Sequence, residues 1–492
     1  MDLVTKEEMK IIDTNTCNRV KSINLMESAG KNIALEIIKD YSFKNVLVLC
    51  GTSGNGGDGF VVARYLLDKK YNVDCFLIGN NLSDDCLINK ERFNGNIITK
   101  INDFNYDLII DGLIGFGLKN QLKENYIDII NKVNSSNIKI VSIDIPTGID
   151  ASSGISYGAY IKADTCYTIE YAKCGLFLNE GLNSYNKLKV IPIGIDKTLN
   201  VIHLNEINDF KGIFKKRERN TNKGSYKKAS IVAGSYKYAG ASYLSYLALS
   251  SFMMGIGYSY LFVPECIYQS FILKEPSILL GSLSSDSNHI KYNEKDLEKL
   301  LSLDSISIGM GMDISIDLYN TIKYLLNKYE GRLVIDADGI NSLAKYGIDI
   351  LKNKKCSVIL TPHLKEMERL TNIKISDIKK DIINIARDFA LEYNVCLILK
   401  GASSIITDGN NICISAFGNT GLAKAGSGDM LSGILSGLLA YLDIDVFKTC
   451  NIACYILGRA AEFAETKIEV ECMRPSDIIS NINNVIKESK NE

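Results

Sequence analysis

The chain has 492 residues, of which 46% are hydrophobic and 23% charged, and its net charge at pH 7 is −1. This length exceeds one ordinary hydrophobic core, so we expect two domains. The near-zero charge gives no electrostatic basis for binding a nucleic acid or a membrane surface. The 13 cysteines are odd in number and several lie in apolar runs, which is typical of reduced, buried cysteines in a cytoplasmic protein.

Neither a signal peptide nor a membrane span is predicted. The N-terminus is polar. The longest apolar stretch, Leu247 to Val263, is broken by serines and glycines, and therefore predicts a buried helix followed by a strand. Cys450 and Cys454 are four apart on a predicted helix, where packing is favoured over metal binding because no partner ligands lie nearby in sequence.

Residues 1–212 alternate between helical and strand patterns. Apolar residues three and four apart predict a helix from Ile23 to Lys39. Short apolar runs predict strands at Val46–Leu49, Val73–Ile78, Leu108–Ile110, Ile140–Ile143 and Val190–Pro192. The alternation predicts an α/β domain with a Rossmann-like, doubly wound, mostly parallel sheet.

Residues 213–224 are polar and crowded with charge, and we expect them to link the first domain to a second one at 225–492. In this second domain the α/β pattern restarts. The predicted strands are Ser230–Ala233, Tyr260–Val263, Ile306–Ile308, Leu333–Ile335, Val358–Leu360 and Leu397–Leu399, with helices near Ser242–Met254 and over Met430–Leu442. The tail from Asp443 to Glu492 is predicted to be mainly helical.

Three polar turns of the first domain each follow a predicted strand: Gly54–Gly59, Asp111–Gly117 and Asp144–Asp150. In open α/β sheets, ligands bind beyond the carboxyl ends of the strands, so these turns are expected to converge. They would bring together Asn55, Asp58, Asp111, Asp144 and Thr147. This set has oxygen donors but no histidine or cysteine, so a bound metal is expected to be a hard cation rather than zinc.

These turns, beginning with Asn55-Gly56-Gly57-Asp58-Gly59, resemble the NAD(P)H-hydrate epimerase family over roughly residues 1–210, and Leu25–Gly30 fits that family's first helix. The resemblance implies that the hydrated dinucleotide binds to Gly54, Asn55, Gly56, Gly57, Asp58, Gly115, Phe116, Gly117, Leu118, Lys119, Asn120, Gln121 and Asp144. It also implies a potassium ion held by Asn55, Asp111 and Thr147.

In the same family, Asp144 and Lys173 are the implied candidates for acid and base, and the sequence does not say which acts. The chain departs from the family at Gly54, where an asparagine is usual, which removes one polar ligand contact. Thr147 replaces a common serine but keeps the hydroxyl.

The second domain has five polar turns at predicted strand ends, which form one candidate active face. They are Gly309–Asp313, Asp336–Asn341, Thr361–Glu366, Lys400–Ser404 and Gly418–Lys424, the last of which leads into Ala425–Asp429. The amides of Gly426, Ser427 and Gly428 open a predicted helix, and the partial positive charge at its N-terminus can stabilise a transferring phosphoryl group. Asp429 repels an anion there, so we interpret it as a base that faces a substrate hydroxyl.

These residues resemble the ribokinase-like superfold and, more closely, the ADP-dependent NAD(P)H-hydrate dehydratases over roughly residues 220–490. The matching motifs are Lys223-Gly224, Gly234-Ser235, Tyr238–Ala241, Thr361-Pro362-His363, Lys400-Gly401-Ala402 and Gly426–Asp429. The resemblance implies that ADP binds at Lys400, Gly401, Ala402, Ser403, Ser404 and Gly428. It places the hydrated dinucleotide near Ala241, Gly311, His363 and Asp429, and implies Mg²⁺ as the partner of the phosphates.

Of the three histidines, only His363 lies in a matching motif, and we expect His203 and His289 to be structural. The residues that follow His363 depart from the family, because Leu364 and Lys365 replace the usual Pro-Gly.

The combined prediction is a bifunctional nicotinamide-nucleotide repair enzyme. The first domain would equilibrate the two C6 epimers of hydrated NADH or NADPH, and the second would dehydrate the S epimer, converting ADP to AMP and phosphate. One alternative is a ribokinase-like small-molecule hydroxyl kinase; another is a non-catalytic nucleotide-binding scaffold, against which the presence of both Asp144 and Asp429 argues. We expect a cytoplasmic homo-oligomer whose partners are these small molecules.

Overall fold

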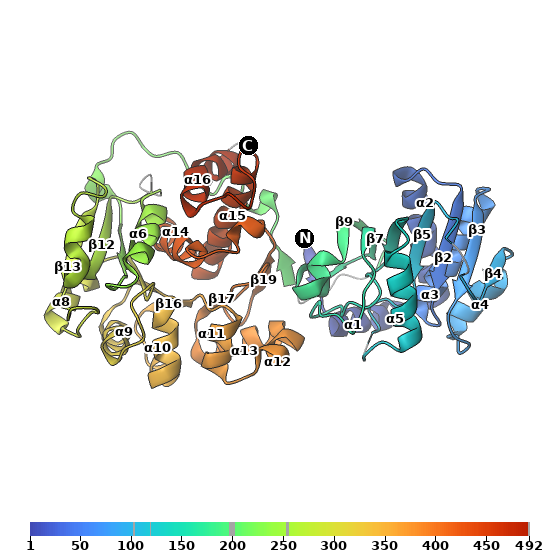
Figure 1. Ribbon diagram of the computed structural model, residues 1–492, viewed down its shortest axis with the longest axis horizontal. Coiled ribbons are helices and arrows are strands. Elements are labelled where there is room, and N and C mark those ends of the chain that lie inside the picture. The colour runs from blue at the N-terminus through green and yellow to red at the C-terminus, as the bar shows by residue number, and fades with distance from the viewer. Residues whose placement is uncertain (102–103, 119, 196–201, 252–254, 491–492) are drawn as a thin grey trace. The chain divides into compact units, whose positions relative to one another are not determined.

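The computed structural model describes residues 1–101, 104–118, 120–195, 202–251 and 255–490 (Figure 1). The chain divides into two compact units, Asp2–Ile202 and His203–Glu492, the second of which also takes in Met1. The segment 213–224, expected to be a linker, therefore lies inside the second unit. Phe210, just before this segment, and Phe214, within it, are both buried in the core of that unit.

The first unit is a parallel α/β domain. Its sheet has the strand order β4-β3-β2-β5-β6-β7-β9, and each neighbouring pair runs parallel. Its elements are β1 (Asp2–Val4), α1 (Lys6–Cys17), α2 (Ser22–Asp40), β2 (Asn45–Cys50), α3 (Gly54–Asp68), β3 (Asn72–Leu77), α4 (Asp84–Arg92), β4 (Asn96–Ile98), β5 (Leu108–Gly112), α5 (Glu124–Asn134), β6 (Lys139–Ile143), β7 (Ala163–Ile169), β8 (Ala172–Lys173) and β9 (Tyr185–Ile191).

Helices cover both faces of this sheet because the side chains of β2 alternate between them. Val46 and Val48 point to the face covered by α2 and α3, whereas Leu47 and Leu49 point to the face covered by α5. The doubly wound architecture is thus confirmed. The sequence patterns missed β7, although β7 is central to the sheet's second half.

The turn predicted at Gly54–Gly59 is wrong in detail, because these residues form the first turns of α3. A Cβ atom on Gly56 would collide with the carbonyl oxygen of Gly51, and one on Gly57 would lie 2.5 Å from the sulfur of Met26. The glycines therefore allow the helix to start tightly against the end of β2.

The second unit is also α/β, with the strand order β13-β12-β11-β14-β15-β16-β17-β18-β19. Strands β13 to β17 are parallel, and β18 and β19 add an antiparallel edge. The strands are β11 (Lys228–Val232), β12 (Tyr258–Pro264), β13 (Leu279–Leu283), β14 (Ser305–Ile308), β15 (Arg332–Ile335), β16 (Ser357–Leu360), β17 (Cys396–Leu399), β18 (Ser404–Thr407) and β19 (Ile412–Ser415); β10 (Ile202–Leu204) spans the division between the units.

Helices flank this sheet as well: α14, α15 and α16 lie on one side, with α9, α10, α11 and α13 on the other (Figure 1). The helices are α6 (Ala239–Ser250), α7 (Glu265–Tyr268), α8 (Glu294–Glu298), α9 (Ile316–Lys328), α10 (Asp338–Tyr346), α11 (Leu364–Thr371), α12 (Ile375–Lys380), α13 (Ile382–Tyr393), α14 (Ser427–Tyr441), α15 (Val446–Glu465) and α16 (Pro475–Lys490). The helical tail is thereby confirmed. Residues 252–254 of the predicted helix Ser242–Met254 lie outside the described part of the chain.

The stretch from Leu247 to Val263 forms the end of α6 and most of β12 in its described parts. None of the described helices is both long and apolar enough to cross a bilayer. Cys450 and Cys454 are buried in the core on α15, and the described residues contain no group of histidine, cysteine and acidic side chains able to hold a metal.

Candidate active sites

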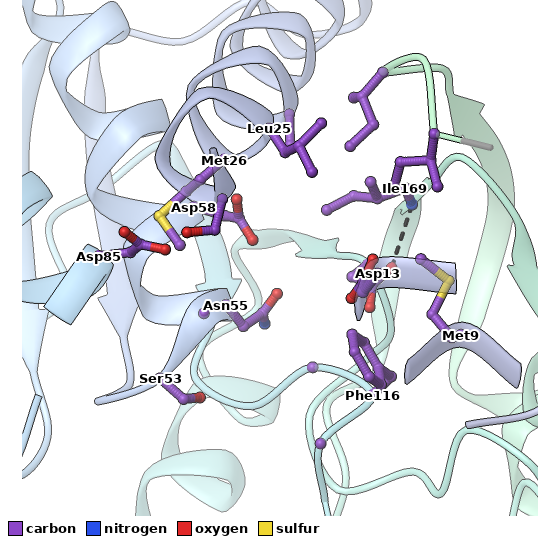
Figure 2. A pocket seen from close by; sticks show the side chains of 18 of the residues that line it. Met9, Asp13, Leu25, Met26, Ser53, Asn55, Asp58, Asp85, Phe116 and Ile169 are labelled. Carbon is purple, nitrogen blue, oxygen red and sulfur yellow. Dashed lines mark hydrogen bonds between the residues drawn. The ribbon is translucent and has the colours of Figure 1, made fainter. Parts of the chain in front are cut away.

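A cavity of about 340 Å³ lies at the carboxyl end of the N-terminal sheet (Figure 2). It brings together three segments predicted to converge, which follow β2, β5 and β6. The predicted site residues in its wall are Gly54, Asn55, Asp58, Gly115, Phe116, Gly117, Asp144 and Lys173. Apolar residues such as Met9 and Leu25 line the rest, so the cavity combines an apolar body with a few polar groups, as is common in small-molecule sites.

Other residues implied as dinucleotide contacts lie outside this wall. Gly56 and Gly57 pack against Gly51 and Met26 instead. Leu118 is buried in the apolar core. Asn120 and Gln121 are exposed, and Lys119 falls outside the described residues.

Asp144 and Lys173 form an ion pair in the cavity wall. The Lys173 side chain is fully buried, and its Nζ also donates to the carbonyl oxygen of Ile169 at 3.1 Å. A buried ammonium needs such partners because desolvation penalises an isolated charge. The backbone of Asp144 has φ +66°, a conformation that costs energy in a residue other than glycine and is concentrated at functional sites.

Asp111, at the end of β5, is a buried hydrogen-bond centre. Its carboxylate accepts from the Thr147 hydroxyl at 2.6 Å, the Thr147 amide at 2.8 Å, the Ser142 hydroxyl at 3.0 Å and the Leu113 amide at 3.2 Å. Burial nevertheless raises the pKa of Asp111. No ion pair to Asp111 occurs within the described residues, so its charge has no nearby compensating cation.

Asn55 completes the oxygen set expected to hold a cation. Its side chain lies against Gly115, where an added Cβ atom would approach Asn55 Oδ1 at 3.2 Å. The Asn55 Nδ2 atom is buried and has no hydrogen-bond partner in the described structure. The amide of Ile114, next to Gly115, donates to Thr147 Oγ1 at 3.0 Å, so the loop after β5 connects all three residues of the set.

Three further carboxyl groups line the cavity, those of Asp13, Asp58 and Asp85. Burial raises the pKa of Asp58 well above its usual range, and the charge of Asp144 adds to the shift. Burial, assisted by Asp144, raises the pKa of Asp13 to about 6. The sequence reasoning missed Asp13 because it lies on helix α1 and not at a strand end. Its spacing of four from both Met9 and Cys17 could have indicated it.

In the second unit, the buried pair Lys400–Asp336 marks the carboxyl edge of the sheet. Lys400 follows β17, Asp336 follows β15, and the ammonium lies 2.8 Å from the carboxylate. Burial acts to lower the pKa of Lys400, but the neighbouring Asp336 outweighs it and holds the pKa above the usual value. Asp336 also accepts from the Ser432 hydroxyl on α14 at 2.8 Å, so it joins the sheet edge to that helix. The sequence placed Asp336 in a turn without assigning it a role.

Helix α14 begins beside this pair. Its N-cap residue, Gly426, has φ +99°, and no side chain caps the first amides. An added Cβ atom on Gly428 would lie 3.3 Å from Lys400 Nζ, so the first turn of α14 and the lysine are neighbours. Uncapped amides at a helix N-terminus, with an ammonium beside them, suit an anionic group such as phosphate.

Asp429 lies in the first turn of the same helix and is partly buried. Burial and the charge of Asp336 together raise its pKa to about 7, whereas Lys400 opposes the shift. A carboxyl group with this pKa both accepts and donates a proton near neutral pH, which suits a general base.

His363 and Glu366 sit at the start of α11, next to Lys400. His363 Nδ1 accepts from the amides of Lys365 and Glu366 at 3.1 and 3.2 Å, and thus caps the helix. Desolvation lowers the pKa of His363, so its neutral, hydrogen-bond-accepting form is favoured. Burial raises the pKa of Glu366 to about 7. The sequence motif contained Glu366 but gave it no function.

The segment expected to bind ADP runs from Lys400 into β18. Gly401 and Ala402 are exposed, and Ser404 pairs within the sheet. The Ser403 hydroxyl is buried and has no hydrogen-bond partner in the described structure. An orphaned polar atom in such a position is consistent with a missing ligand.

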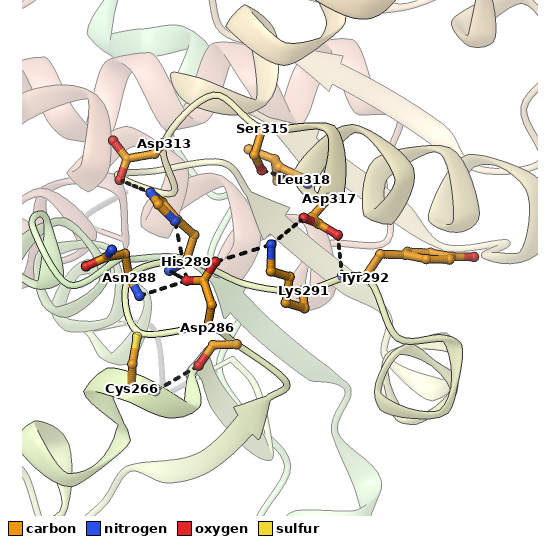
Figure 3. Close-up of polar contacts among 11 residues, drawn as sticks. Cys266, Asp286, Asn288, His289, Lys291, Tyr292, Asp313, Ser315, Asp317 and Leu318 are labelled. Atoms are coloured by element: carbon orange, nitrogen blue, oxygen red, sulfur yellow. Dashed lines mark hydrogen bonds and ion pairs between the residues drawn. The ribbon is translucent and has the colours of Figure 1, made fainter.

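Ala241 and Gly311, two residues expected near the hydrated dinucleotide, lie in contact. A Cβ atom on Gly311 would be 2.9 Å from the Ala241 Cβ. Close by, His289 lies between Asp286 and Asp313 at 3.5 and 3.6 Å, part of a charged surface network (Figure 3). This arrangement agrees with the expected structural role of His289.

The two halves of the chain match two family profiles. The profile described as NAD(P)H-hydrate dehydratase matches residues 229–484, and the one described as YjeF-related protein N-terminus matches residues 22–175. The chain is 32% identical over 483 residues to a bifunctional NAD(P)H-hydrate repair enzyme Nnr of Dictyoglomus turgidum, covering 93% of each chain. It is 30% identical over 516 residues to the protein of the same name from Methanocaldococcus jannaschii, covering 99% of this chain and 94% of that one.

Solved structures resemble the second unit in fold. An ADP/ATP-dependent NAD(P)H-hydrate dehydratase from Bacillus subtilis, co-crystallised with ATP and Mg²⁺, superimposes with a TM-score of 0.51 at 22% identity, covering 60% of this chain and 100% of that one. A ribokinase-like superfamily protein from Enterococcus faecalis gives a TM-score of 0.50 at 18% identity, covering 59% and 96%. The ribokinase-like fold expected for the second domain is thereby confirmed.

Proposed function

Because the chain belongs to the family of bifunctional NAD(P)H-hydrate repair enzymes, we propose a chemical role for each of its two sites. The N-terminal unit interconverts the R and S forms of hydrated NADH or NADPH. The C-terminal unit dehydrates the S form and consumes ADP. Both activities, an isomerase and a lyase, match the family predicted from the motifs.

At the N-terminal site, Asp144 and Lys173 serve as the acid–base pair. Epimerisation at C6 of the hydrated ring requires that the C6–N1 bond opens and closes again, with proton transfer to and from the C6 oxygen. The ion pair is supported as this catalyst by its place in the cavity wall and by its burial. Gly54, Asn55, Asp58 and the segment 115–117 then contact the dinucleotide.

A potassium ion at Asn55, Asp111 and Thr147 belongs to the same proposal. The set fits a hard monovalent cation, because it offers amide, carboxylate and hydroxyl oxygens. When bound, the ion supplies positive charge next to the desolvated carboxylate of Asp111. The residues themselves then hold the loop after β5 in place at the edge of the cavity.

At the C-terminal site, Asp429 is the base. It takes the proton of the C6 hydroxyl, and the oxygen attacks the β-phosphorus of ADP, so that AMP leaves. The resulting phosphate ester loses phosphate as the ring nitrogen donates its electron pair, and loss of the C5 proton yields NAD(P)H. The observation that carries this assignment is the contiguity of Asp429, the uncapped amides of α14 and the Lys400–Asp336 pair.

The segment Lys400–Ser404 and Gly428 would bind ADP, and Ala241, Gly311 and His363 would contact the hydrated dinucleotide. The orphaned Ser403 hydroxyl supports the first assignment. Mg²⁺ would neutralise phosphate charge, held mainly through the phosphates themselves. Glu366 fits as the protein carboxylate on this ion, since Asp336 is already paired with Lys400.

An absorbance assay at the reduced-nicotinamide band tests the proposal. Mixed epimers of hydrated NADH are incubated with the full chain, Mg²⁺ and either ADP or ATP, and we expect complete conversion to NADH with ADP. A chain that converts no hydrate but phosphorylates a compound from a panel of alcohols would instead be a ribokinase-like hydroxyl kinase. A cytoplasmic location and homo-oligomeric assembly remain predictions from the sequence.

A further inference from the structure

Asp13 is a cavity acid to which neither the motifs nor the proposed chemistry assigns a role. Helix α1 presents one face to the cavity, because Met9, Asp13 and Cys17 all line it at a spacing of four residues. Figure 2 shows Asp13 beside Phe116 and, across the cavity, Asp58 and Asp85.

The helix that carries Asp13 is fixed at its N-terminal end. Thr5 and Glu8 form a capping box, and the Lys6 amide donates to Ser152 Oγ at 2.8 Å. Lys6 Nζ also donates to the carbonyl oxygen of Leu118, at the end of the loop that carries Phe116. Asp13 is therefore held on a rigid element and not on a free tail.

The carboxyl group of Asp13 is unengaged. Within the described residues it has neither a hydrogen-bond partner nor an ion-pair partner, although it is partly buried. Asp144, by contrast, is tied to Lys173. The charges that act on the Asp13 carboxyl group are those of Asp144, at the end of β6, and Lys173, on β8. Asp58 on α3 and Asp85 on α4 line the same cavity.

The epimerisation requires two positions for proton transfer. The hydroxyl at C6 lies on opposite faces of the ring in the two epimers, so the oxygen must lose a proton at one position and regain one at another. A single ion pair in one wall serves one of these positions well. A second group has to come from another wall, and α1 supplies that wall.

We infer that Asp13 is the second proton-transfer group of the N-terminal site and acts together with the Asp144–Lys173 pair, in which Asp144 holds the Lys173 ammonium. In the R-to-S direction, Asp13 accepts the hydroxyl proton, the C6–N1 bond breaks to give an aldehyde, and the electron pair passes to N1 and its conjugated carboxamide. After rotation, N1 attacks the other face of the aldehyde and the new alkoxide takes a proton from the Lys173 ammonium. The reverse direction exchanges the two roles, and solvent resets both groups.

Two observations favour Asp13 over Asp58 for this role. Asp58 is buried, whereas Asp13 is only partly buried where it lines the cavity, and burial raises the pKa of Asp58 well above its usual range. The pKa of Asp13, at about 6, allows both protonation states. Asp13 therefore suits a group that exchanges protons in the cavity.

The test compares Asp13→Asn with Asp85→Asn, which removes the same charge from the same cavity. Mixed epimers of hydrated NADH are given to each full-length variant with ADP and Mg²⁺. We expect Asp13→Asn to convert the S fraction at the normal rate and the R fraction ~10²–10⁴-fold more slowly, with KM little changed. Asp85→Asn should convert both fractions as the wild type does. When a full-length Asp429→Ala variant, whose epimerase site is intact, is added to the Asp13→Asn reaction, conversion of the R fraction should be restored.

The inference rests on the proposed epimerase function, and the assay distinguishes a failure of that function from a failure of the role assigned to Asp13. If the wild type leaves the R fraction unconverted, the epimerase proposal fails. If the wild type converts it and Asp13→Asn does so at a similar rate, the role of Asp13 is refuted. A raised KM with unchanged kcat would also refute it, since that pattern assigns Asp13 to binding.

A second variant guards against misfolding. Asp13→Glu keeps the carboxyl group, and we expect it to retain more epimerisation than Asp13→Asn. In the wild type, the epimerisation rate should fall as the pH drops through about 6, where Asp13 becomes protonated, and this fall should be absent in Asp13→Asn. An unchanged pH profile in Asp13→Asn, or equal rates for the two variants, would overturn the assignment.

Discussion

The ammonium of Lys400 lies 2.8 Å from the carboxylate of Asp336, and both side chains are mostly buried at the edge of the second sheet. The pair does two things at once. It neutralises the charge that Lys400 would otherwise carry into a desolvated site. Through Ser432, which donates to Asp336, it also fixes the position of α14, whose first turn carries Asp429.

The first prediction concerns the stability that this pair provides. Asp336→Ala leaves the buried Lys400 ammonium without its partner, and we expect the free energy of unfolding of the C-terminal unit to fall by about 3–5 kcal/mol. Asp349→Ala is the matched control, because it breaks a pair with Lys352 whose side chains are 80% and 45% exposed. It should cost about 0–1 kcal/mol. Urea denaturation measures both, and equal losses would contradict the structural role.

Asp429→Ala removes the proposed base. We expect dehydration to be abolished and epimerisation to be unchanged, because Asp429 belongs to the second unit only. A loss smaller than ~10² in kcat would argue against a central role, since even the removal of one stabilising donor from an anion site costs about that much. The measurement is NADH formation from S hydrate, with R-to-S conversion followed separately.

The pH dependence of dehydration follows from the raised pKa of Asp429. Its carboxyl group is protonated below about pH 7 and ionised above it, and only the ionised form accepts the hydroxyl proton. We therefore expect kcat/KM to rise with pH through about 7 and then level off. A profile that is flat between pH 5.5 and about 8.5 would contradict the assignment, because kcat/KM reports the essential groups of the free enzyme.

Asp111 is predicted to govern the potassium response of epimerisation. Asp111→Ala removes the only carboxylate of the proposed cation set, so we expect lower epimerase activity and a weakened dependence on potassium concentration. Ser142→Ala deletes one hydrogen bond to Asp111 but no residue of the set, and serves as the control. Titration of potassium chloride against sodium chloride provides the readout. A titration curve for Asp111→Ala that superimposes on that of the wild type would rule out the cation site.

Much of the architecture was predictable because local rules determined it. Apolar runs identified strands such as β2 and β15, and the polar turns that follow them marked the carboxyl edges of both sheets. The start of α3 was mistaken for a turn, because six residues rich in glycine disfavour a helix in isolation. Tertiary packing overrides that propensity: the helix starts so close to the backbone of Gly51 that a Cβ atom on Gly56 would collide with it.

The site was predictable only where function lies at strand ends. Asp144 and Lys173 were named as a pair from family motifs, and the structure joins them in an ion pair. Asp336 had been seen only as part of a turn, because nothing local tells which of its neighbours is a buried cation. The only local signal for Asp13 was its spacing of four from Met9 and Cys17, and an acid on an amphipathic helix is ordinarily exposed to solvent.

The sequence by itself determined two α/β units, the loops that carry the chemistry and the family to which the chain belongs, because these follow from hydrophobic periodicity and from short motifs. Only the tertiary structure decided which charges are desolvated together. The raised pKa values of Asp13 and Asp429 and the pairing of Lys400 with Asp336 arise from burial between elements distant in sequence. Desolvation depends on the neighbours in space, and the order of residues along the chain does not specify those neighbours.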